Sequence, residues 1–241
     1  MLTVKDVSKR FGNFTALSHI SFSLSQGEVV GLLGANGSGK TTLLRILSTM
    51  LSPSEGEAYI NGYRLGQDNA SIRKNVGVLF GSDAGLYDEL TGEENLLYFA
   101  ALSSVPKKNA EQRIQNLANK LEFEKYLGMR AGAMSKGMRQ KIVFARSVIH
   151  DPALLLLDEP ESGLDFQAAQ TVYDFIMHCK KDGKGVLFSS HSMDSVRHCA
   201  QRVLMLKNGQ LMADEVLDNN VLVKQNQLSQ LIDDYIKGGT N

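Results

Sequence analysis

The 241-residue sequence is poor in cysteine, in net charge and in long apolar runs. Its two cysteines, Cys179 and Cys199, belong to no CxxC or Cys/His spacing, so we expect ordinary, partly buried thiols in a reducing, cytosolic setting. Basic and acidic side chains both number 26, and the resulting net charge of zero argues against nucleic acid as the main partner.

No apolar run approaches the ~18 residues that a membrane span needs. The opening stretch MLTVKDVSKRF carries charges where a signal peptide would need an apolar core. A hydrophobic content of 43% with 22% charged residues is ordinary for a soluble globular protein. We therefore expect a soluble chain, with room for one large domain or for one domain that carries a subdomain.

Apolar runs and helical spacings alternate along the chain. Nearly uninterrupted apolar runs predict strands buried on both faces, and apolar residues at helical spacing predict helices between them. The buried strands are expected at 28–34, 75–80, 153–157 and 185–190, and helices at 41–50, 166–180 and 193–200. Strands that alternate with helices predict an α/β fold with a mainly parallel sheet.

The two ends of the chain and its middle depart from this alternation. Short alternating strands at 2–7 and 20–24, with a further strand and turn at 58–62, predict an N-terminal antiparallel β subdomain. Helical spacing from about 83 to 150 predicts an inserted helical subdomain. Residues 203–214 predict a hairpin turning at Asn208-Gly209. We expect the tail, about 215–241, to be helical, because apolar residues recur at Leu228, Leu231, Ile232 and Tyr235.

The strongest motif is the stretch GANGSGKT, which fits the phosphate-binding pattern GxxxxGK[ST]. It follows an apolar strand and opens a helix, so glycine-rich backbone can point N–H groups at phosphate oxygens while the helix dipole adds to the attraction. Lys40 would bind the β- and γ-phosphates, and the Thr41 hydroxyl would coordinate Mg²⁺. The nucleotide-binding candidates are Gly34, Asn36, Gly37, Ser38, Gly39, Lys40, Thr41 and Thr42.

Two carboxylates follow the apolar run Leu154–Leu157. Side chains alternate along a strand, so we expect Asp158 and Glu159 to point in different directions. Asp158 is the candidate metal residue, together with Thr41, and Glu159 is the candidate for polarising an attacking water.

The order of these motifs with AMSKGMRQK, SGLD and FSSH resembles the ATP-binding subunit of an ABC transporter over essentially the whole chain. The resemblance implies a single ATP-binding domain, 1–241, with the ABC ATPase fold. It implies ATP and Mg²⁺ as cofactors and ATP hydrolysis coupled to transport. It also implies a dimer, a separately encoded membrane permease as partner, and a peripheral position on the cytoplasmic face of the cell membrane.

The stretch Met134–Met138 matches the family's LSGGQ signature at Ser135 and Gly137. These two residues open a helix, so a hydroxyl and backbone N–H groups can form an anion site. In the family that site closes over the γ-phosphate held by the other subunit. Lys136 replaces a glycine of the consensus, and its cation either strengthens the phosphate contact or is simply solvated.

Four further residues take roles from the resemblance alone. Phe11 lies where the family has an aromatic ring stacked on adenine, with Ala16 nearby. Asp165 belongs to the loop that joins the two sites of the dimer. His191 matches the switch histidine that contacts the γ-phosphate, and the other four histidines match nothing.

Within the family, the chain is similar to the sodium-extrusion and drug-export (ABC-2 type) branch. The similarity rests on the stretch KGMRQK, on the joint after residue 80 and on the spacing of the residues that follow the phosphate loop. The expected cargo is Na⁺, and the alternatives are a drug, a lipid or another solute. A soluble ABC ATPase acting on the ribosome or DNA is a rival, but this neutral chain shows neither a second cassette nor basic patches. Leu86, Tyr87 and Tyr98 are expected as exposed apolar residues that dock the membrane subunit.

One position departs from the family at the expected active site. After the strand 75–80 the family has a glutamine that reaches Mg²⁺ and the attacking water, whereas this chain has Gly81 and no glutamine until Gln112. The glycine-rich joint can still flex. We expect water, or else Ser82 or Asp83, to complete the magnesium shell.

The substitution Gly81→Gln tests this expectation. If position 81 still reaches the metal, the new side chain will change both the Mg²⁺ dependence and the rate of ATP hydrolysis, because it adds an oxygen ligand of the kind Mg²⁺ prefers. Phosphate release measured over a magnesium titration provides the readout. An unchanged titration and rate would mean that this position no longer contacts the metal.

Overall fold

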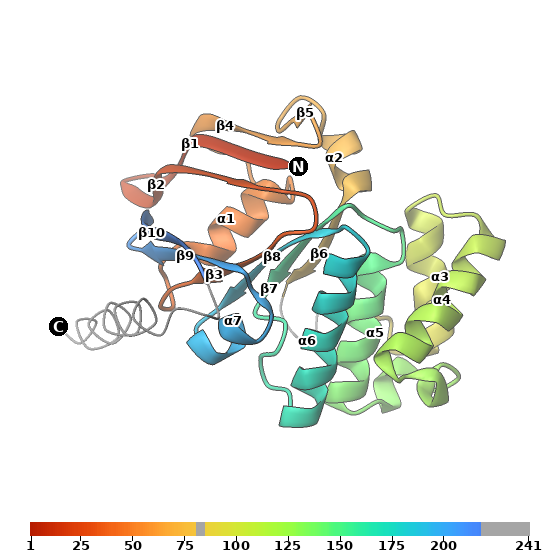
Figure 1. Cartoon of the computed structure of the whole chain (residues 1–241). Helices are drawn as coiled ribbons and strands as arrows, with labels where there is room; N and C mark the ends of the chain where they lie inside the picture. The colour runs from red at the N-terminus through yellow and green to blue at the C-terminus, as the bar shows by residue number, and fades with distance from the viewer. Residues whose placement is uncertain (81–84, 218–241) are drawn as a thin grey trace.

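The computed structural model describes residues 1–80 and 85–217, which form two β-sheets and the helices around them (Figure 1). The larger sheet has six strands in the order β10-β9-β3-β8-β7-β6. Five of its strands are parallel, and β10 runs antiparallel to β9. The bounds are β3 (Val29–Leu33), β6 (Val76–Phe80), β7 (Leu154–Asp158), β8 (Gly185–Ser190), β9 (Arg202–Lys207) and β10 (Gln210–Val216). The mainly parallel sheet predicted from the sequence is confirmed.

The smaller sheet is antiparallel and has the order β2-β1-β4-β5. Its strands are β1 (Leu2–Phe11), β2 (Phe14–Leu24), β4 (Glu55–Ile60) and β5 (Tyr63–Arg64). The first two are longer than the sequence predicted, because they continue to the tight turn at Gly12, whose φ is 58°. Polar residues near this turn hid the length of the hairpin from the hydrophobic pattern.

Helices cover both faces of the large sheet (Figure 1). Their bounds are α1 (Lys40–Leu47), α2 (Asn69–Asn75), α3 (Gly92–Leu102), α4 (Lys107–Leu121), α5 (Lys136–Val148), α6 (Phe166–Lys181) and α7 (Met193–Cys199), with short 3₁₀ turns at Glu124–Tyr126 and Ala131–Ala133. None of the helices within the described residues is long and apolar enough to cross a membrane.

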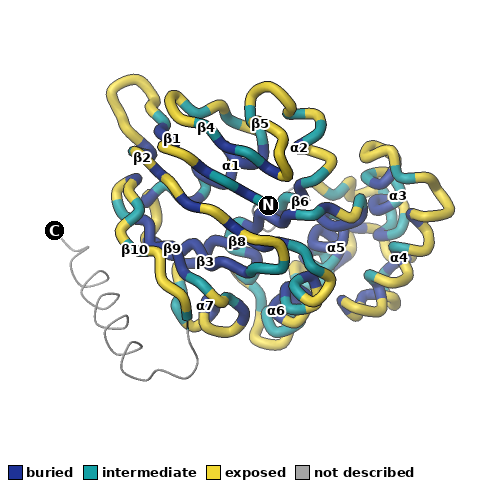
Figure 2. Tube along the Cα trace, turned by 45° about the horizontal axis from the view of Figure 1, so that its top comes forward, coloured by how far each residue is buried: buried dark blue, intermediate teal, exposed yellow. Residues whose placement is uncertain are grey.

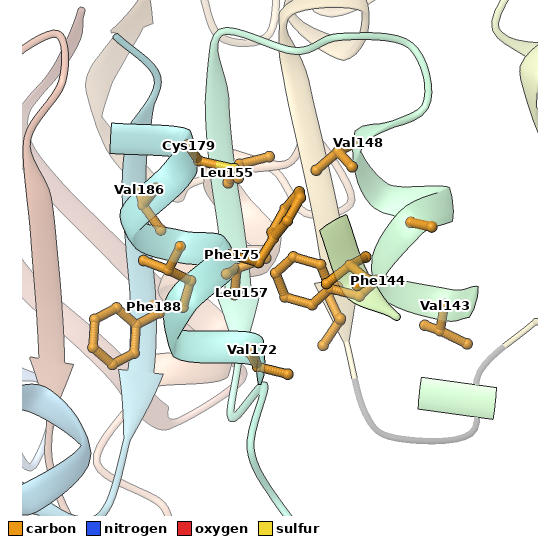
Figure 3. Close-up of a cluster of buried hydrophobic side chains, with 14 of the residues drawn as sticks. Val143, Phe144, Val148, Leu155, Leu157, Val172, Phe175, Cys179, Val186 and Phe188 are labelled. Atoms are coloured by element: carbon orange, nitrogen blue, oxygen red, sulfur yellow. The ribbon is translucent and has the colours of Figure 1, made fainter. Parts of the chain in front are cut away.

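Successive residues of the buried strands contribute to two separate cores. Leu155 and Leu157 of β7 pack with α5 and α6, whereas Leu154 and Leu156 pack with α1 and the small sheet. Figure 3 shows the first core, where Phe144 of α5 meets Phe175 of α6 edge-on at a centroid distance of 4.8 Å. Figure 2 shows the large sheet as mostly buried between exposed outer turns. Because successive side chains point to opposite faces and both faces are buried, these strands are apolar throughout.

Strand register brings the carboxyl ends of β3, β8 and β7 to one edge of the sheet. Leu33 pairs with Ser190, and Ser189 pairs with Asp158. The loop after β3, the carboxylates after β7 and the histidine after β8 therefore leave the sheet side by side. In open α/β sheets this edge is the usual place for ligands.

The secondary-structure predictions differ from the structure in a few places. Helix α1 begins one residue before the predicted start and ends at Leu47, and Thr49 then has a left-handed φ of 67°. The hairpin turning at Asn208-Gly209 is confirmed. The short elements α2 and β5 carry no clear periodicity and were missed. Strand β10 extends to Val216, and the predicted helical tail beyond residue 217 lies outside the described residues.

The three residues expected to be exposed apolar docking candidates fall into two groups. Tyr87 and Tyr98 are exposed and contact each other edge-on, with centroids 5.0 Å apart. The prediction for Leu86 was wrong, because its side chain is half-buried against the core that contains α3 and α5.

Both cysteines are buried. Burial raises the pKa of the Cys179 and Cys199 thiols to about 12, which makes them unreactive.

Substitution of Phe144 tests the core between α5 and α6. Phe144→Ala should lower the free energy of unfolding by about 3–5 kcal/mol, because it removes a fully buried ring and leaves a cavity. Urea denaturation followed by circular dichroism measures the change. The matched control is Leu102→Ala on the exposed surface of α3, for which we expect a change within about 0.5 kcal/mol. Equal effects of the two substitutions would contradict this picture of the core.

Candidate functional site

The phosphate loop, residues 34–39, connects β3 to α1. Two glycines have no room for a side chain: a Cβ at Gly34 would lie 2.5 Å from the Ser38 hydroxyl, and one at Gly39 would lie 2.8 Å from the Ala16 carbonyl. Gly39 is the N-cap of α1, with a left-handed φ of 109°, and supplies no side-chain hydrogen bond. The first backbone N–H groups of α1 therefore lack a side-chain cap and remain suited to bind an anion.

Lys40 is the first residue of α1, and its side chain is only 5% exposed. Its Nζ donates hydrogen bonds to the carbonyls of Gly34 at 2.7 Å and Ala35 at 3.2 Å, and lies 4.0 Å from Glu159 Oε1. Burial lowers the pKa of Lys40, and the nearby carboxylates of Glu159 and Asp158 oppose that shift. The loop thus holds a desolvated Lys40 side chain, and an added phosphate charge would stabilise its charged form.

The hydroxyl of Thr41 donates a hydrogen bond to Asp158 Oδ2 at 2.8 Å. The second oxygen of Asp158 accepts from the Ser189 hydroxyl at 2.6 Å, so the carboxylate is fixed from two sides. This pairing of a hydroxyl with a carboxylate suits Mg²⁺, which prefers oxygen ligands and commonly binds through one carboxylate plus phosphates. No cluster of three or more His, Cys, Asp and Glu side chains forms a metal site in residues 1–80 and 85–217.

Glu159 lies just beyond the end of β7 and has a left-handed φ of 49°. Its Oε1 is 3.7 Å from Nδ1 of His191, whose side chain is 62% exposed. Asp158 faces Thr41 and Glu159 faces Lys40 and His191, so the two carboxylates point to different partners as expected. The reason differs from strand alternation, because the strand has already ended at Asp158.

A second half-site lies at the start of α5. Ser135 caps this helix, and its hydroxyl accepts a hydrogen bond from the Met138 backbone N–H. Ser135, Gly137 and Asp165 line one hollow of about 610 Å³, and Asp165 in turn caps α6. The residues of the phosphate-loop edge do not line this hollow. Lys136 is exposed and extends over Gly163.

The remaining candidates are placed as follows. Ala16 is buried beside Gly39, and Asn36 and Gly37 are exposed on the phosphate loop, whereas Thr42 is half-buried in α1. Phe11 is 47% exposed at the end of β1, where it pairs with Phe14 across the turn. Gly81, Ser82 and Asp83 lie outside the described residues, so the predicted magnesium contacts at the joint stay predictions.

Several polar residues that the sequence analysis missed are buried around the site. Ser189 accepts a hydrogen bond from the Glu159 backbone N–H, and Ser190 bonds to Glu161. Gln140 of α5 is buried and donates to the Pro160 carbonyl. The only available signal was that a strand otherwise buried and apolar ends in two serines before His191.

The ABC transporter family model matches residues 17–162. The chain is 39% identical over 223 residues to the ABC transporter ATP-binding protein NatA of Bacillus subtilis, which covers 91% of each chain. It is 34% identical over 215 residues to the doxorubicin resistance ATP-binding protein DrrA of Mycobacterium tuberculosis, covering 88% of this chain and 65% of DrrA.

Solved structures agree with these relatives. The structure of an ATP-binding subunit of an ABC transporter superposes with a TM-score of 0.86 at 30% identity and covers 98% of both chains. A dimeric ATP-binding cassette, in a post-hydrolysis state with ADP and Pi, superposes with a TM-score of 0.80 at 26% identity, covering 91% of this chain and 100% of the other. The phosphate loop and the paired carboxylates agree with these similarities. The chain therefore belongs to the ABC transporter family and is one of its ATP-binding, ATP-hydrolysing subunits.

Proposed function

We propose that this chain powers an exporter in which two copies bind two Mg·ATP, close, hydrolyse and reopen. These movements would drive a separately encoded membrane permease, with the chain held on the cytoplasmic face of the cell membrane. The observation that carries the proposal is the convergence of Lys40, Thr41, Asp158, Glu159 and His191 at one edge of the large sheet.

Each residue at this edge has a distinct proposed role. Lys40 binds the β- and γ-phosphates, and Thr41 and Asp158 hold Mg²⁺, which would neutralise phosphate charge when bound. Glu159 accepts a proton from the attacking water, and His191 contacts the γ-phosphate. Both of these side chains remain partly exposed, so a nucleotide and a water can reach them.

The second half-site supports a dimer of this chain or of this chain with a similar one. Ser135 and Gly137 present a helix start in a hollow that the residues of the phosphate-loop edge do not line, so we propose that they serve the nucleotide of a partner copy. A dimeric cassette with ADP and Pi among the similar structures supports this arrangement. Nothing in the neutral charge balance favours nucleic acid as a partner instead.

Na⁺ is the proposed cargo, because the similarity to NatA extends over nearly the full length of both chains. The similarity to DrrA makes drug export the second candidate, by the same mechanism. Lipid or other solute export and a non-transport ABC ATPase are the remaining alternatives.

The proposed docking groove for the permease has a volume of about 550 Å³ and is lined in part by Phe99, whose ring contacts that of Tyr98 edge-on. It lies between the end of α1, β6 and the helices α3 and α5, and Phe99 and Arg146 are among its lining residues. Arg146 stacks over the Phe99 ring at 4.8 Å and donates to the Gly85 carbonyl. Arg73 and Arg146 bring two cations, and none of the described residues lining the groove is acidic. A permease segment that carries a carboxylate fits this lining.

Replacement of Glu159 by glutamine tests the chemistry. Glu159→Gln should still bind ATP and dimerise, but hydrolyse at least about 100-fold more slowly, because the amide cannot act as a general base. Phosphate release measures hydrolysis, and size-exclusion chromatography with ATP measures dimerisation. The control is Glu57→Gln, a half-buried carboxylate of β4, which should hydrolyse normally. Undiminished turnover in Glu159→Gln would remove Glu159 from this role.

Reconstitution with the co-purified permease tests the cargo. Vesicles with ATP supplied on the side of this chain should move ²²Na⁺ across the membrane, and Na⁺ should stimulate ATP hydrolysis. Stimulation by a drug with no ²²Na⁺ movement would replace sodium by the second candidate.

The variant Arg73→Glu tests the docking groove, because it reverses a charge there. It should keep the basal ATPase rate but lose the stimulation, whereas Lys181→Glu at the end of α6 should keep both. Normal stimulation of Arg73→Glu would exclude this groove.

A further inference from the structure

Strand β8 ends in two fully buried serines directly before His191. Because side chains alternate along a strand, the two hydroxyls serve different neighbours. The Ser189 hydroxyl donates to the Asp158 carboxylate and accepts from the backbone N–H of Glu159, both at the phosphate-loop edge. Ser190 donates a hydrogen bond of 2.8 Å to Oε1 of Glu161, a residue with no role so far.

Glu161 is a half-buried carboxylate whose Oε2 is buried without a hydrogen-bond partner. A carboxylate kept from water at this cost depends strongly on the one hydrogen bond its other oxygen accepts. The Ser190 hydroxyl also accepts from the Ser192 backbone N–H at 3.0 Å. The contact with Glu161 thus fixes a hydroxyl that bonds across His191, and with it the backbone from which the His191 side chain extends.

The loop that carries Glu161 is also attached to the signature helix. Gln140 Nε2 donates to the Pro160 carbonyl at 3.2 Å, and the Gln140 side chain is fully buried. Ser135, the cap of α5, lies five residues before Gln140, which is about one and a half turns of rigid helix. One unbroken set of contacts therefore runs from Ser135 through Gln140, the 160–161 backbone and Ser190 to His191.

We propose that Glu161 is a positioning residue that couples the signature half-site to His191 within one chain. When Ser135 engages the nucleotide of a partner copy, a shift of α5 would pass through Pro160 and Glu161 to Ser190 and move His191 in the chain's own site. This inference rests on the proposed roles of Ser135 and His191. It adds the route by which one site of the dimer senses the other.

The variants Glu161→Ala and Ser190→Ala test this route from both ends of the hydrogen bond. Each should lower kcat on the order of tenfold through a misplaced His191, and leave the KM for ATP within about twofold because no phosphate contact is removed. The Hill coefficient for ATP should fall toward about 1, since the sites no longer communicate. ATP hydrolysis measured over a full ATP titration gives all three quantities.

Two further variants separate positioning from a general loss of structure. Glu161→Gln keeps an oxygen that can accept from Ser190, so it should restore kcat and cooperativity. The double variant Glu161→Ala/Ser190→Ala should be no slower than either single variant, because both remove the same contact. Glu57→Ala is the control: it also removes a half-buried carboxylate bonded to a hydroxyl, but should leave kcat and the Hill coefficient unchanged.

The outcomes separate this inference from the proposed function. If the wild type hydrolyses ATP and Glu159→Gln does not, normal kcat and cooperativity in Glu161→Ala would overturn the inference alone. Additive losses in the double variant would also overturn it, because the two residues would then act separately. Absence of hydrolysis in the wild type would instead overturn the proposed function. If Glu161→Ala does not fold, Ser190→Ala carries the same prediction.

Discussion

The parallel register of β3, β8 and β7 is the constraint on which the site depends. It places Leu33, Ser189–Ser190 and Asp158 at one edge, so three loops from distant parts of the sequence emerge together. The two cores hold this register, because each strand contributes alternate side chains to both. A slip of one residue would exchange the two faces and separate Thr41 from Asp158.

Burial and charge at this edge act together on the phosphate loop. Lys40 is desolvated enough to lower its pKa, and Glu159 and Asp158 oppose that shift from nearby. A nucleotide adds phosphate charge where the helix start and the amine are already in place. The site is therefore preorganised for a highly charged ligand, which fits an ATPase better than a general binding module.

This chain departs from the family pattern at places that connect sites rather than at the phosphate loop. Gly81 replaces the expected glutamine, and Lys136 replaces a signature glycine.

The sequence by itself determined the buried strands, the phosphate loop and the order of motifs, because these depend on local spacing and on glycine. It predicted Asp158 beside Thr41, and the structure brings them to 2.8 Å. Only the tertiary structure decided that Leu86 is half-buried, that β1 and β2 extend to their turn, and that Ser190 meets Glu161. Such contacts join residues some thirty positions apart, and local patterns carry no information about which distant side chain completes a buried hydrogen bond.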